Sequence, residues 1–356
     1  MKQSFAQRGR SMLKPYKRAE LAFEELREIG ADGRNSTTWV VNDVQLGAEI
    51  VMKTIAKAQL RDVSEFFDEA KSLYATAHQN VVQIHYACED ADNVYIAMPF
   101  YRRGSVKGIM EAAHLTTREI IRLGCQLLSG LHNIHSKGLI HFDIKPDNIL
   151  LSNRGEAMLS DFGLAKQVHL GVAVPNGLYI RMAPPEATGQ PPFDLRFDIY
   201  QVGLTLYRMA IGNDAFNFQF ARFTQGGGLD VATLAAEIQA GTFPDRQAFH
   251  EHVPMRLRRV ITKCLEPDPD ARFSSALAVA NALAAVDDSL DWRLEKGVVN
   301  KMWTKNEAGT QKCFVVNQDG STEFTTTAAG GQPRRKRDLC RPRMTRRDIE
   351  GVLRQN

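Results

Sequence analysis

The chain lacks the features that mark membrane-spanning and secreted proteins. No run of about 18 or more apolar residues, the length needed to cross a bilayer, occurs in its 356 residues. The first residues, MKQSFAQRGRSMLK, contain no apolar core of a signal peptide. The five cysteines are scattered without a C-x-x-C pair, which argues against a disulfide framework and a structural zinc site. We therefore expect a cytoplasmic protein with reduced thiols and no membrane association.

Charge is unevenly distributed, although the formal net charge is only +4. Residues 1–18 and 301–356 are basic, whereas the chain between them carries an excess of acidic residues. Such basic ends are usually solvated, but they also suit contacts with nucleic acid, with an acidic partner or with the acidic body of the same chain.

The pattern of apolar residues predicts an α+β fold with a β-rich half before a helical half. Short β-prone runs occupy 37–41, 49–53, 82–86 and 94–98. A helix is expected between the second and third runs, capped by Asp62 with Glu65 at the third position. Amphipathic helices are then expected at 117–136, 197–211, 230–240, 255–265 and 274–285. A hairpin-like stretch at 139–163 interrupts the helical half.

The segment after Asp291 changes character again. A turn signal at 318–320 separates two β-prone runs and predicts a small hairpin. A basic run follows at 334–337, and Thr345 can cap a short terminal helix with Asp348 at the third position.

The most informative stretch is HFDIKPDN at 141–148, followed by DFG at 161–163. In such a stretch Asp143 can orient an attacking hydroxyl and accept its proton, and Lys145 can neutralise a phosphate oxygen. Asn148 and Asp161 are suited to holding magnesium. These residue types at this spacing indicate phosphoryl transfer.

The stretch resembles the catalytic and metal-binding loops of protein kinases, H-R-D-x-K-x-x-N and D-F-G, with Phe142 where most kinases carry Arg. Lys145 matches the Ser/Thr-directed form. The resemblance implies a bilobal kinase-like fold, ATP and Mg as cofactors, and Ser/Thr hydroxyls of a protein substrate as acceptors. It makes Asp143 and Lys145 catalytic and Asn148 and Asp161 metal ligands.

Further parts of the kinase pattern appear upstream. Lys53 ends a run that resembles the V-A-I-K strand, and Glu69 would orient it from the following helix, because it precedes a segment at 78–82 that resembles H-P-N-I-V. The resemblance assigns both residues to the catalytic set. Gly30 and Gly33 stand where the glycine loop belongs, with one glycine fewer than G-x-G-x-x-G, and Ser36 can donate a hydrogen bond in place of the third.

Residues 98–105 resemble the hinge that joins the two lobes in protein kinases. Met98 would be the gatekeeper, and the Pro99 carbonyl and the Tyr101 N–H would meet the adenine edge. Proline is compatible with position 99 because that position offers a carbonyl and not an N–H. Val51 completes the expected nucleotide-contacting set.

Motifs further along the chain distinguish protein kinases from small-molecule phosphotransferases, which share the earlier motifs. The sequence MAPPE at 182–186 resembles A-P-E, and Arg272 resembles the distant Arg that pairs with Glu186. Asp198 fits the central helix that anchors the catalytic loop. The resemblance covers roughly residues 20–288, with lobes at 19–100 and 101–289 between a basic extension at 1–18 and a C-terminal extension at 290–356.

The segment between Gly163 and Ala183 contains no Ser or Thr, and its only hydroxyl side chain is that of Tyr179. In kinases that carry Arg at the position of Phe142, this Arg contributes to a basic pocket that phosphorylation of the segment neutralises. Both features predict that phosphorylation of this segment is not the on-switch. Ser/Thr kinases also usually carry a Thr a few residues before A-P-E, where this chain has Gly177 and Leu178.

Two functions compete. The first is an active Ser/Thr protein kinase; the second is a nucleotide-binding pseudokinase scaffold whose basic tail binds a partner or nucleic acid. With either one, residues 334–347 could bind nucleic acid or dock on the acidic body, and Thr345 is a candidate for self-phosphorylation. The sequence indicates no particular oligomeric state, substrate or pathway.

Overall fold

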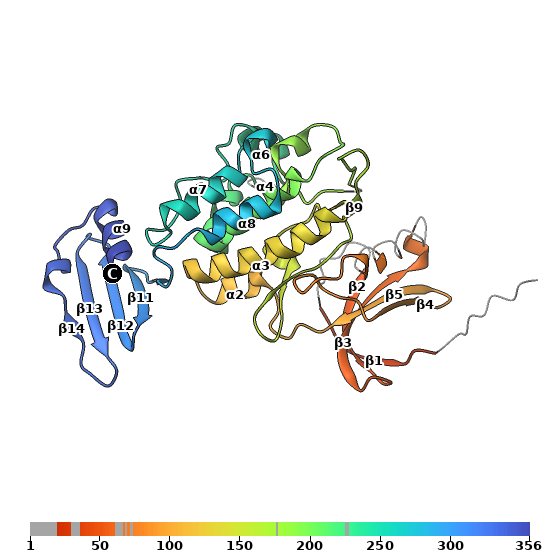
Figure 1. The fold of residues 1–356 in the computed structure, drawn as a ribbon, viewed down its shortest axis with the longest axis horizontal. Coiled ribbons are helices and arrows are strands. Elements are labelled where there is room, and N and C mark those ends of the chain that lie inside the picture. The colour runs from red at the N-terminus through yellow and green to blue at the C-terminus, as the bar shows by residue number, and fades with distance from the viewer. Residues whose placement is uncertain are drawn as a thin grey trace, which may run out of the picture.

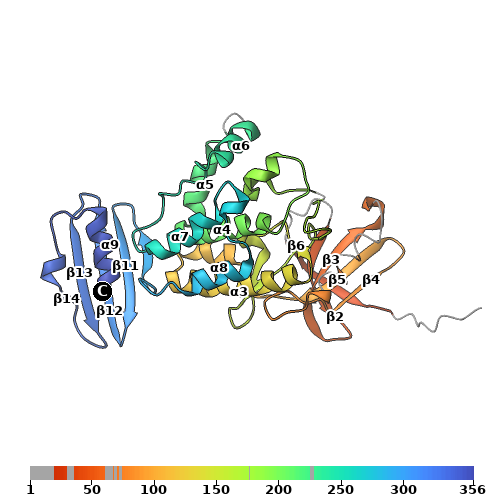
Figure 2. The same cartoon turned by 45° about the horizontal axis from the view of Figure 1, so that its top comes forward.

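The computed structural model describes residues 20–29, 36–60, 67, 70–71, 74–175, 177–224 and 228–356. Three bodies follow one another along the long axis: a β-rich lobe, a central helical lobe and a C-terminal sheet (Figures 1 and 2). The α+β, two-lobed architecture predicted from the sequence is confirmed. Within the described part of the chain, no helix is both long and apolar enough to span a membrane.

The β-rich lobe is one antiparallel sheet in the order β1-β2-β3-β5-β4. Its strands are β1 (Phe23–Glu28), β2 (Thr37–Asp43), β3 (Ala48–Ala56), β4 (Tyr86–Glu89) and β5 (Asn93–Pro99). Strands β2, β3 and β5 confirm three of the four predicted runs, and β1 is an additional strand. One face of the sheet buries Val41, Ile50, Met52 and Ala97 in a small apolar cluster.

The strand predicted at 82–86 is wrong, because only Tyr86 belongs to a strand. The alternating apolar residues there are used differently. Val81 makes an isolated parallel bridge with Leu159 of the helical lobe, and the Val82 N–H donates to the Leu159 carbonyl at 2.9 Å. This segment therefore connects the two lobes and does not extend the sheet.

The helical lobe surrounds α4 (Arg196–Ile211), in which every residue after Arg196 is buried. Gly203 lets α4 and the end of α7 approach closely, since a Cβ there would lie 2.7 Å from the Cβ of Cys264. The other helices are α2 (Val106–Ala112), α3 (Thr117–Ser136), α5 (Asn213–Ala221), α6 (Val231–Gln239), α7 (Met255–Cys264) and α8 (Ala276–Ala284). All five helices predicted for this half are present, while α2 and α5 are additional. The start of the helix predicted from Asp62 lies outside the described residues.

Two short β-pairs carry the residues of the hairpin-like stretch. They are β6 (Leu139–Ile140) with β9 (Lys166–Gln167), and β7 (Ile149–Leu151) with β8 (Ala157–Leu159). The first pair places the loop after β6 beside the segment that follows the DFG sequence.

The C-terminal part is larger than the hairpin expected from the sequence. It is an antiparallel sheet with the order β10-β11-β12-β13-β14, followed by helix α9. The elements are β10 (Arg293–Lys296), β11 (Asn300–Glu307), β12 (Thr310–Asn317), β13 (Thr322–Ala328), β14 (Arg334–Arg335) and α9 (Arg346–Gln355). Trp303, Phe314 and Phe324 lie in register across three strands and pack with Leu353 of α9 in a separate core.

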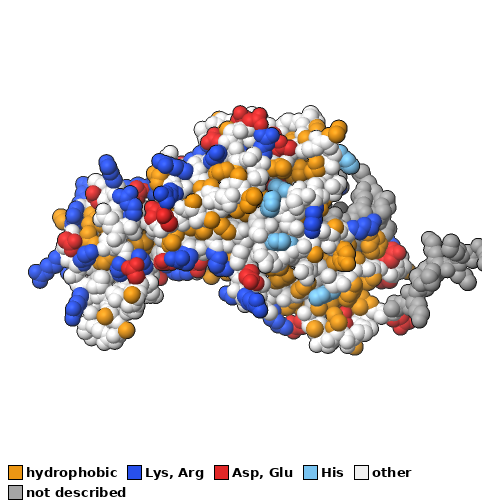
Figure 3. Space-filling view, viewed as in Figure 1, with side chains coloured by type: hydrophobic (Ala, Val, Ile, Leu, Met, Phe, Trp, Pro, Cys, Tyr) orange, Lys and Arg blue, Asp and Glu red, His pale blue; other side chains and the backbone are white. Residues whose placement is uncertain are grey.

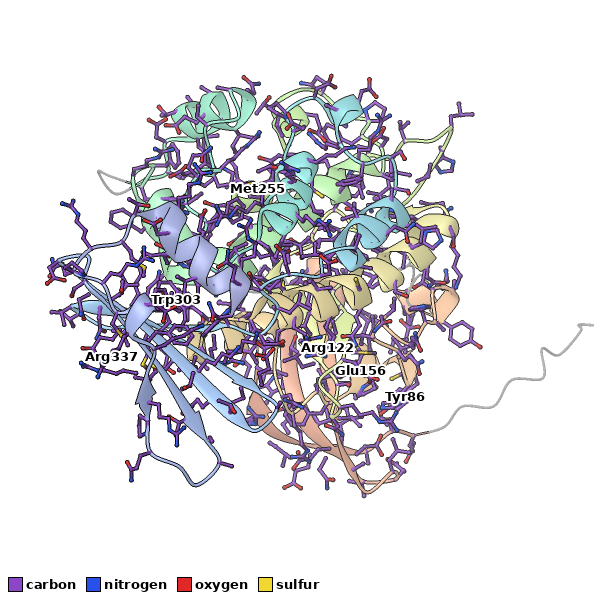
Figure 4. All side chains as sticks on the ribbon, turned by 60° about the vertical axis from the view of Figure 1, so that its left-hand side comes forward. Tyr86, Arg122, Glu156, Met255, Trp303 and Arg337 are labelled. Atoms are coloured by element: carbon purple, nitrogen blue, oxygen red, sulfur yellow. The ribbon has the colours of Figure 1, made fainter. Side chains whose placement is uncertain are left out.

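The C-terminal sheet is docked on the helical lobe. The Trp303 indole N–H donates to Nδ1 of His252 at 3.1 Å, and burial lowers the pKa of His252 to about 3, so the ring is neutral and can accept. Glu350 of α9 pairs with Arg258 of α7 at 2.8 Å. Figure 4 shows α9 and Trp303 on the side of the sheet that faces the helical lobe.

Candidate active site

The loop after β6 is held by the buried carboxylate of Asp198 in the first turn of α4. Asp198 is 0% exposed and accepts hydrogen bonds from the N–H groups of His141 and Phe142, each at 2.8 Å. The Nε2 atom of His135 lies 2.8 Å from the same carboxylate. The sequence indicated the anchoring role of Asp198 but gave no signal for His135, which lies on α3.

Gln201, one helical turn after Asp198, fixes the next part of the loop. Its amide oxygen accepts from the Ile144 N–H at 2.9 Å, and its Nε2 donates to the Phe142 carbonyl at 3.0 Å. Phe142 has φ +64°, a left-handed conformation that costs a non-glycine residue about 1–3 kcal/mol. The bonds from Asp198 and Gln201 on either side stabilise this conformation. No motif in the sequence marks Gln201, although its spacing of three from Asp198 places both residues on one helical face.

Asp143 lies in the middle of this loop with its carboxylate paired. Lys145 Nζ lies 3.0 and 2.7 Å from the two carboxylate oxygens, and Asn148 Nδ2 donates to one of them at 2.8 Å. Asn148 also donates to the Asp143 backbone carbonyl at 2.9 Å. The structure thus brings together three of the residues that the sequence assigned to catalysis and metal binding.

Asp161 faces the same space from the other side. Its Oδ1 atom lies 3.5 Å from Lys53 Nζ of β3, and this pair joins the β-rich lobe to the loop that carries the DFG sequence. Burial raises the pKa of the Asp161 carboxyl, but the nearby positive groups, Lys53 first, outweigh this and hold the pKa below its usual value. The group is therefore an anion at neutral pH and can bind a cation.

Phe162, the residue after Asp161, anchors the DFG loop in the apolar core. Phe162 is 1% exposed and its ring packs edge-on against His141, with centroids 5.0 Å apart. The His141 ring also joins the two loops, because its Nε2 lies 3.1 Å from the Ser160 carbonyl and its Nδ1 accepts from the Asp143 N–H at 3.3 Å.

Strands β3 and β5 place the expected nucleotide residues on one face. Val51 and Lys53 point to the same side because they are two apart on β3, and their partners across the ladder are Met98 and Ile96. Val51 is 8% exposed, and Pro99 ends β5 opposite Ile50.

Tyr101 and Ser36 flank this face. Tyr101 lies two residues beyond β5, and burial raises the pKa of its phenol to about 12. Ser36 directly precedes β2 and is half-buried. The other expected site residues, Gly30, Gly33 and Glu69, lie outside the described residues.

The segment after the DFG sequence is fixed by backbone pairing and by aromatic packing. Ala173 and Phe193 exchange N–H···O=C hydrogen bonds at 2.8 and 2.9 Å, and β9 pairs with β6. Phe142 is fully buried against Phe193 and Phe197, with ring centroids 6.5 and 5.0 Å away. An apolar cluster thus occupies the position where an Arg would require a negative partner.

A bidentate ion pair holds the C-terminal end of this segment, at Glu186. The guanidinium of Arg272 donates to the two carboxylate oxygens of Glu186 at 2.7 and 2.6 Å. It also donates to three backbone carbonyls and lies 4.9 Å from the centre of the Tyr200 ring. The pairing predicted between these two distant residues is present, and the donors of the buried guanidinium are well satisfied.

The donor set suits magnesium. Carboxylate and amide oxygens are the protein ligands that Mg²⁺ prefers, usually alongside water and substrate phosphates. The Asn148 amide directs its NH₂ group at Asp143, which leaves its oxygen available to a cation. Asp161 supplies the second oxygen donor.

Comparisons with known proteins agree with this geometry. Residues 23–284 match the family model described as protein kinase domain. The chain is 30% identical over 271 residues to the serine/threonine-protein kinase PknJ of Mycobacterium tuberculosis, an alignment that covers 73% of this chain and 44% of PknJ. It is 31% identical over 284 residues to the serine/threonine-protein kinase Pkn2 of Myxococcus xanthus, covering 75% of this chain and 33% of that relative. Against PrkC of Bacillus subtilis the identity is 26% over 270 residues, with 73% and 40% covered. The matched part thus spans less than half the length of each of these relatives.

Proposed function

The chain belongs to the protein kinase family, and on that basis we propose that it transfers the γ-phosphoryl group of ATP to Ser or Thr hydroxyls of a protein. The observation that carries the proposal is the convergence of Asp143, Lys145 and Asn148 with the Lys53–Asp161 pair. The names of the relatives, all serine/threonine-protein kinases, support the choice of acceptor.

Each of these side chains has one role in the proposed reaction. Asp143 orients the acceptor hydroxyl and accepts its proton, while Lys145 neutralises charge on the transferred group. Lys53 holds the α and β phosphates, and Asn148 and Asp161 would hold the metal. Bound magnesium supplies charge neutralisation at the phosphates.

The remaining predicted residues have binding roles in the proposal. Val51 and Met98 would line the adenine pocket, and the Pro99 carbonyl and Tyr101 N–H would meet the adenine edge. Ser36, with Gly30 and Gly33, would contact phosphate, and Glu69 would orient Lys53.

The direct test is mass spectrometry of the purified chain after incubation with Mg-ATP, alone and with a generic basic protein such as myelin basic protein. We expect added phosphate on Ser or Thr of the chain or of the added protein. Omitting magnesium should abolish the transfer. Nucleotide binding without any transfer would instead favour the pseudokinase scaffold.

We further propose that the enzyme does not need phosphorylation of the segment between Asp161 and Glu186. Phe142 packs in the apolar cluster with Phe193 and Phe197, so no unpaired positive charge at this position needs a phosphate to neutralise it. Backbone pairing of the segment with its neighbours supports the same proposal.

Phosphatase treatment of the purified enzyme is therefore expected to leave the initial rate of phosphoryl transfer unchanged. Mass spectrometry of residues 164–182 provides the control, since it shows whether Tyr179 carried phosphate before treatment. A large loss of rate that accompanies loss of phosphate from Tyr179 would contradict this proposal.

A specific feature of the C-terminal sheet favours an additional, nucleic-acid-binding function. Residues 334–343 run along β13 at the sheet edge, where Arg334 and Arg335 pair with Thr326 and Thr325 and the Arg341 carbonyl accepts from the Thr322 N–H at 2.8 Å. This segment exposes a row of basic side chains, which we call the basic edge: Arg334, Arg335, Lys336, Arg337, Arg341 and Arg343. Lys and Arg side chains crowd this end of the molecule in Figure 3, and Figure 4 shows Arg337 on the outer side of the sheet.

Half of the basic edge is available to a partner. Among the described residues, Arg335 pairs with Glu323, and the side chains of Lys336 and Arg341 donate to the Asn356 side chain and the Asp338 carbonyl. The other three side chains, Arg334, Arg337 and Arg343, have no such partner there. The contacts between the C-terminal part and the helical lobe that hold the sheet in place use other residues, such as Glu350. Unpaired guanidinium groups in a row suit the regularly spaced phosphates of a nucleic acid.

Changing Arg334, Arg337 and Arg343 together to Ala is expected to weaken binding of a short DNA or RNA duplex. The slope of log K against log salt concentration should fall by about 1 for each phosphate that the variant no longer neutralises. The matched control changes the exposed Arg222, Arg256 and Arg259 of the helical lobe, which removes the same charge elsewhere. Equal weakening in both triple variants would indicate a diffuse charge effect, and absence of binding by the unchanged protein would exclude the function.

A further inference from the structure

The ring of Tyr179 contacts the catalytic lysine. Lys145 Nζ lies 4.5 Å from the centre of this ring, a cation–π distance, and the same atom lies 2.7 Å from a carboxylate oxygen of Asp143. The lysine charge therefore contacts both an anion and an aromatic ring. This contact joins the segment after the DFG sequence directly to the reacting groups.

The backbone that carries Tyr179 is firmly anchored. Tyr179 immediately precedes a short 3₁₀ turn, Ile180–Met182, in which Met182 is fully buried. Arg181 donates to the Asn217 side chain at 2.7 Å, and its guanidinium lies 4.3 Å from the centre of the Phe220 ring. These contacts fix the turn against α5, so the position of the ring is set by the fold and not by Lys145 alone.

The ring, and not the hydroxyl, makes the contact. Within the part of the chain that the structure describes, the Tyr179 hydroxyl has no hydrogen-bond partner, and the residue is 39% exposed. The segment offers no Ser or Thr that could bond to both Asp143 and Lys145. In the described part of this segment, the Tyr179 ring instead makes the contact with Lys145.

We propose that Tyr179 is a positioning residue that holds Lys145 for phosphoryl transfer through its aromatic face, in place of a bridging hydroxyl. The inference rests on the proposed kinase activity. Lysine has a long flexible side chain, and restraining it before ATP binds lowers the cost of bringing its charge to the transition state. The restraint acts on the chemical step, and we therefore expect it in kcat and not in the KM for ATP.

The test compares three substitutions of Tyr179 in the full chain, with Mg-ATP and myelin basic protein as substrates. Tyr179→Phe and Tyr179→Trp, which keep an aromatic face, should retain kcat. Tyr179→Leu, which fills similar space without the ring, should lower kcat by about 2- to 30-fold, the range that ordinary cation–π strengths correspond to. The KM for ATP and the midpoint of thermal unfolding should stay unchanged in all three.

The neighbouring Leu178→Ala, at a partly exposed position without a role in the proposed contact, serves as the matched control and should behave like the unchanged enzyme. Full kcat in Tyr179→Leu, or equal losses in Tyr179→Phe and Tyr179→Leu, would overturn the inference. Absence of activity in the unchanged chain would instead refute the proposed kinase function, so the two failures are distinguishable.

Discussion

Replacing Asp143 by Asn is expected to lower kcat for phosphoryl transfer by about 10²–10⁴-fold, the contribution of a positioned general base. The amide cannot accept the proton of the acceptor hydroxyl, and it loses the charge that pairs with Lys145 at 2.7 Å. Asparagine has nearly the same shape, and the loop is held by Asp198 and Gln201, so the fold should persist. The affinity for ATP, measured by titration calorimetry, should therefore change little.

Asp147→Asn is the matched control for this prediction. Asp147 lies in the same loop but pairs with Lys107 of α2 at 3.0 Å, away from the proposed reacting groups. Both partners of this pair are half-buried, and Asp147 also lies 4.0 Å from the guanidinium of the buried Arg208 of α4, so the variant should lose some stability. Its kcat should stay unchanged, because these contacts do not involve the proposed reacting groups. An Asp143→Asn enzyme with full kcat would show that Asp143 is not the base.

Replacing Arg272 by Met is expected to lower the free energy of unfolding by about 3–5 kcal/mol, the usual cost of breaking a buried ion pair. Glu186 would lose both of its charged hydrogen bonds, and the three carbonyls bound by Arg272 would lose their donor. Urea denaturation followed by circular dichroism measures the change. Activity should fall in parallel, because Glu186 ends the segment that carries Tyr179.

Two comparisons sharpen this result. Arg256→Met breaks the exposed pair with Asp287 at 2.7 Å and should cost less than about 1 kcal/mol. The double variant Arg272→Met/Glu186→Leu should recover part of the lost stability, because it leaves no unpaired carboxylate. Recovery cannot be complete, since the carbonyl acceptors stay unsatisfied. An Arg272→Met protein as stable as the unchanged chain would contradict the stabilising role of the pair.

The sequence predicted the chemical centre better than its supports. Asp143, Lys145 and Asn148 lie within one short loop, and a local pattern fixes their relative positions. The side chains that hold the loop come from distant helices, and Gln201 and His135 are ordinary polar residues in amphipathic or buried helices. Only the fold reveals that they converge on the same backbone.

Elements were mispredicted where one local pattern permits several tertiary uses. Residues 82–86 alternate like a strand, yet the Val82 N–H bonds to Leu159 of the other lobe. In the C-terminal part, a turn signal made β12 and β13 visible. Strands β10 and β11 were missed because they are rich in Lys, Glu and Asn, and their one core aromatic, Trp303, is buried through contacts far along the chain.

The site itself was also partly hidden from sequence reasoning. The contact between Lys145 and Tyr179 spans residues far apart in sequence and depends on the turn that begins at Ile180. A cation–π contact has no spacing rule that a linear pattern could expose. The sequence therefore shows that Tyr179 carries the only hydroxyl side chain between Gly163 and Ala183, but it does not show that the Tyr179 ring contacts Lys145.

The firm docking of the C-terminal sheet on the helical lobe has a geometric consequence. The bonds of Trp303 to His252 and of Glu350 to Arg258 keep the basic edge at one end of the molecule, while the β-rich lobe forms the other end (Figure 2). A partner held at the basic edge could present to Asp143 only an acceptor that reaches past the whole helical lobe. The chain would then act as a molecular ruler, which selects an acceptor by its reach as well as by its chemistry.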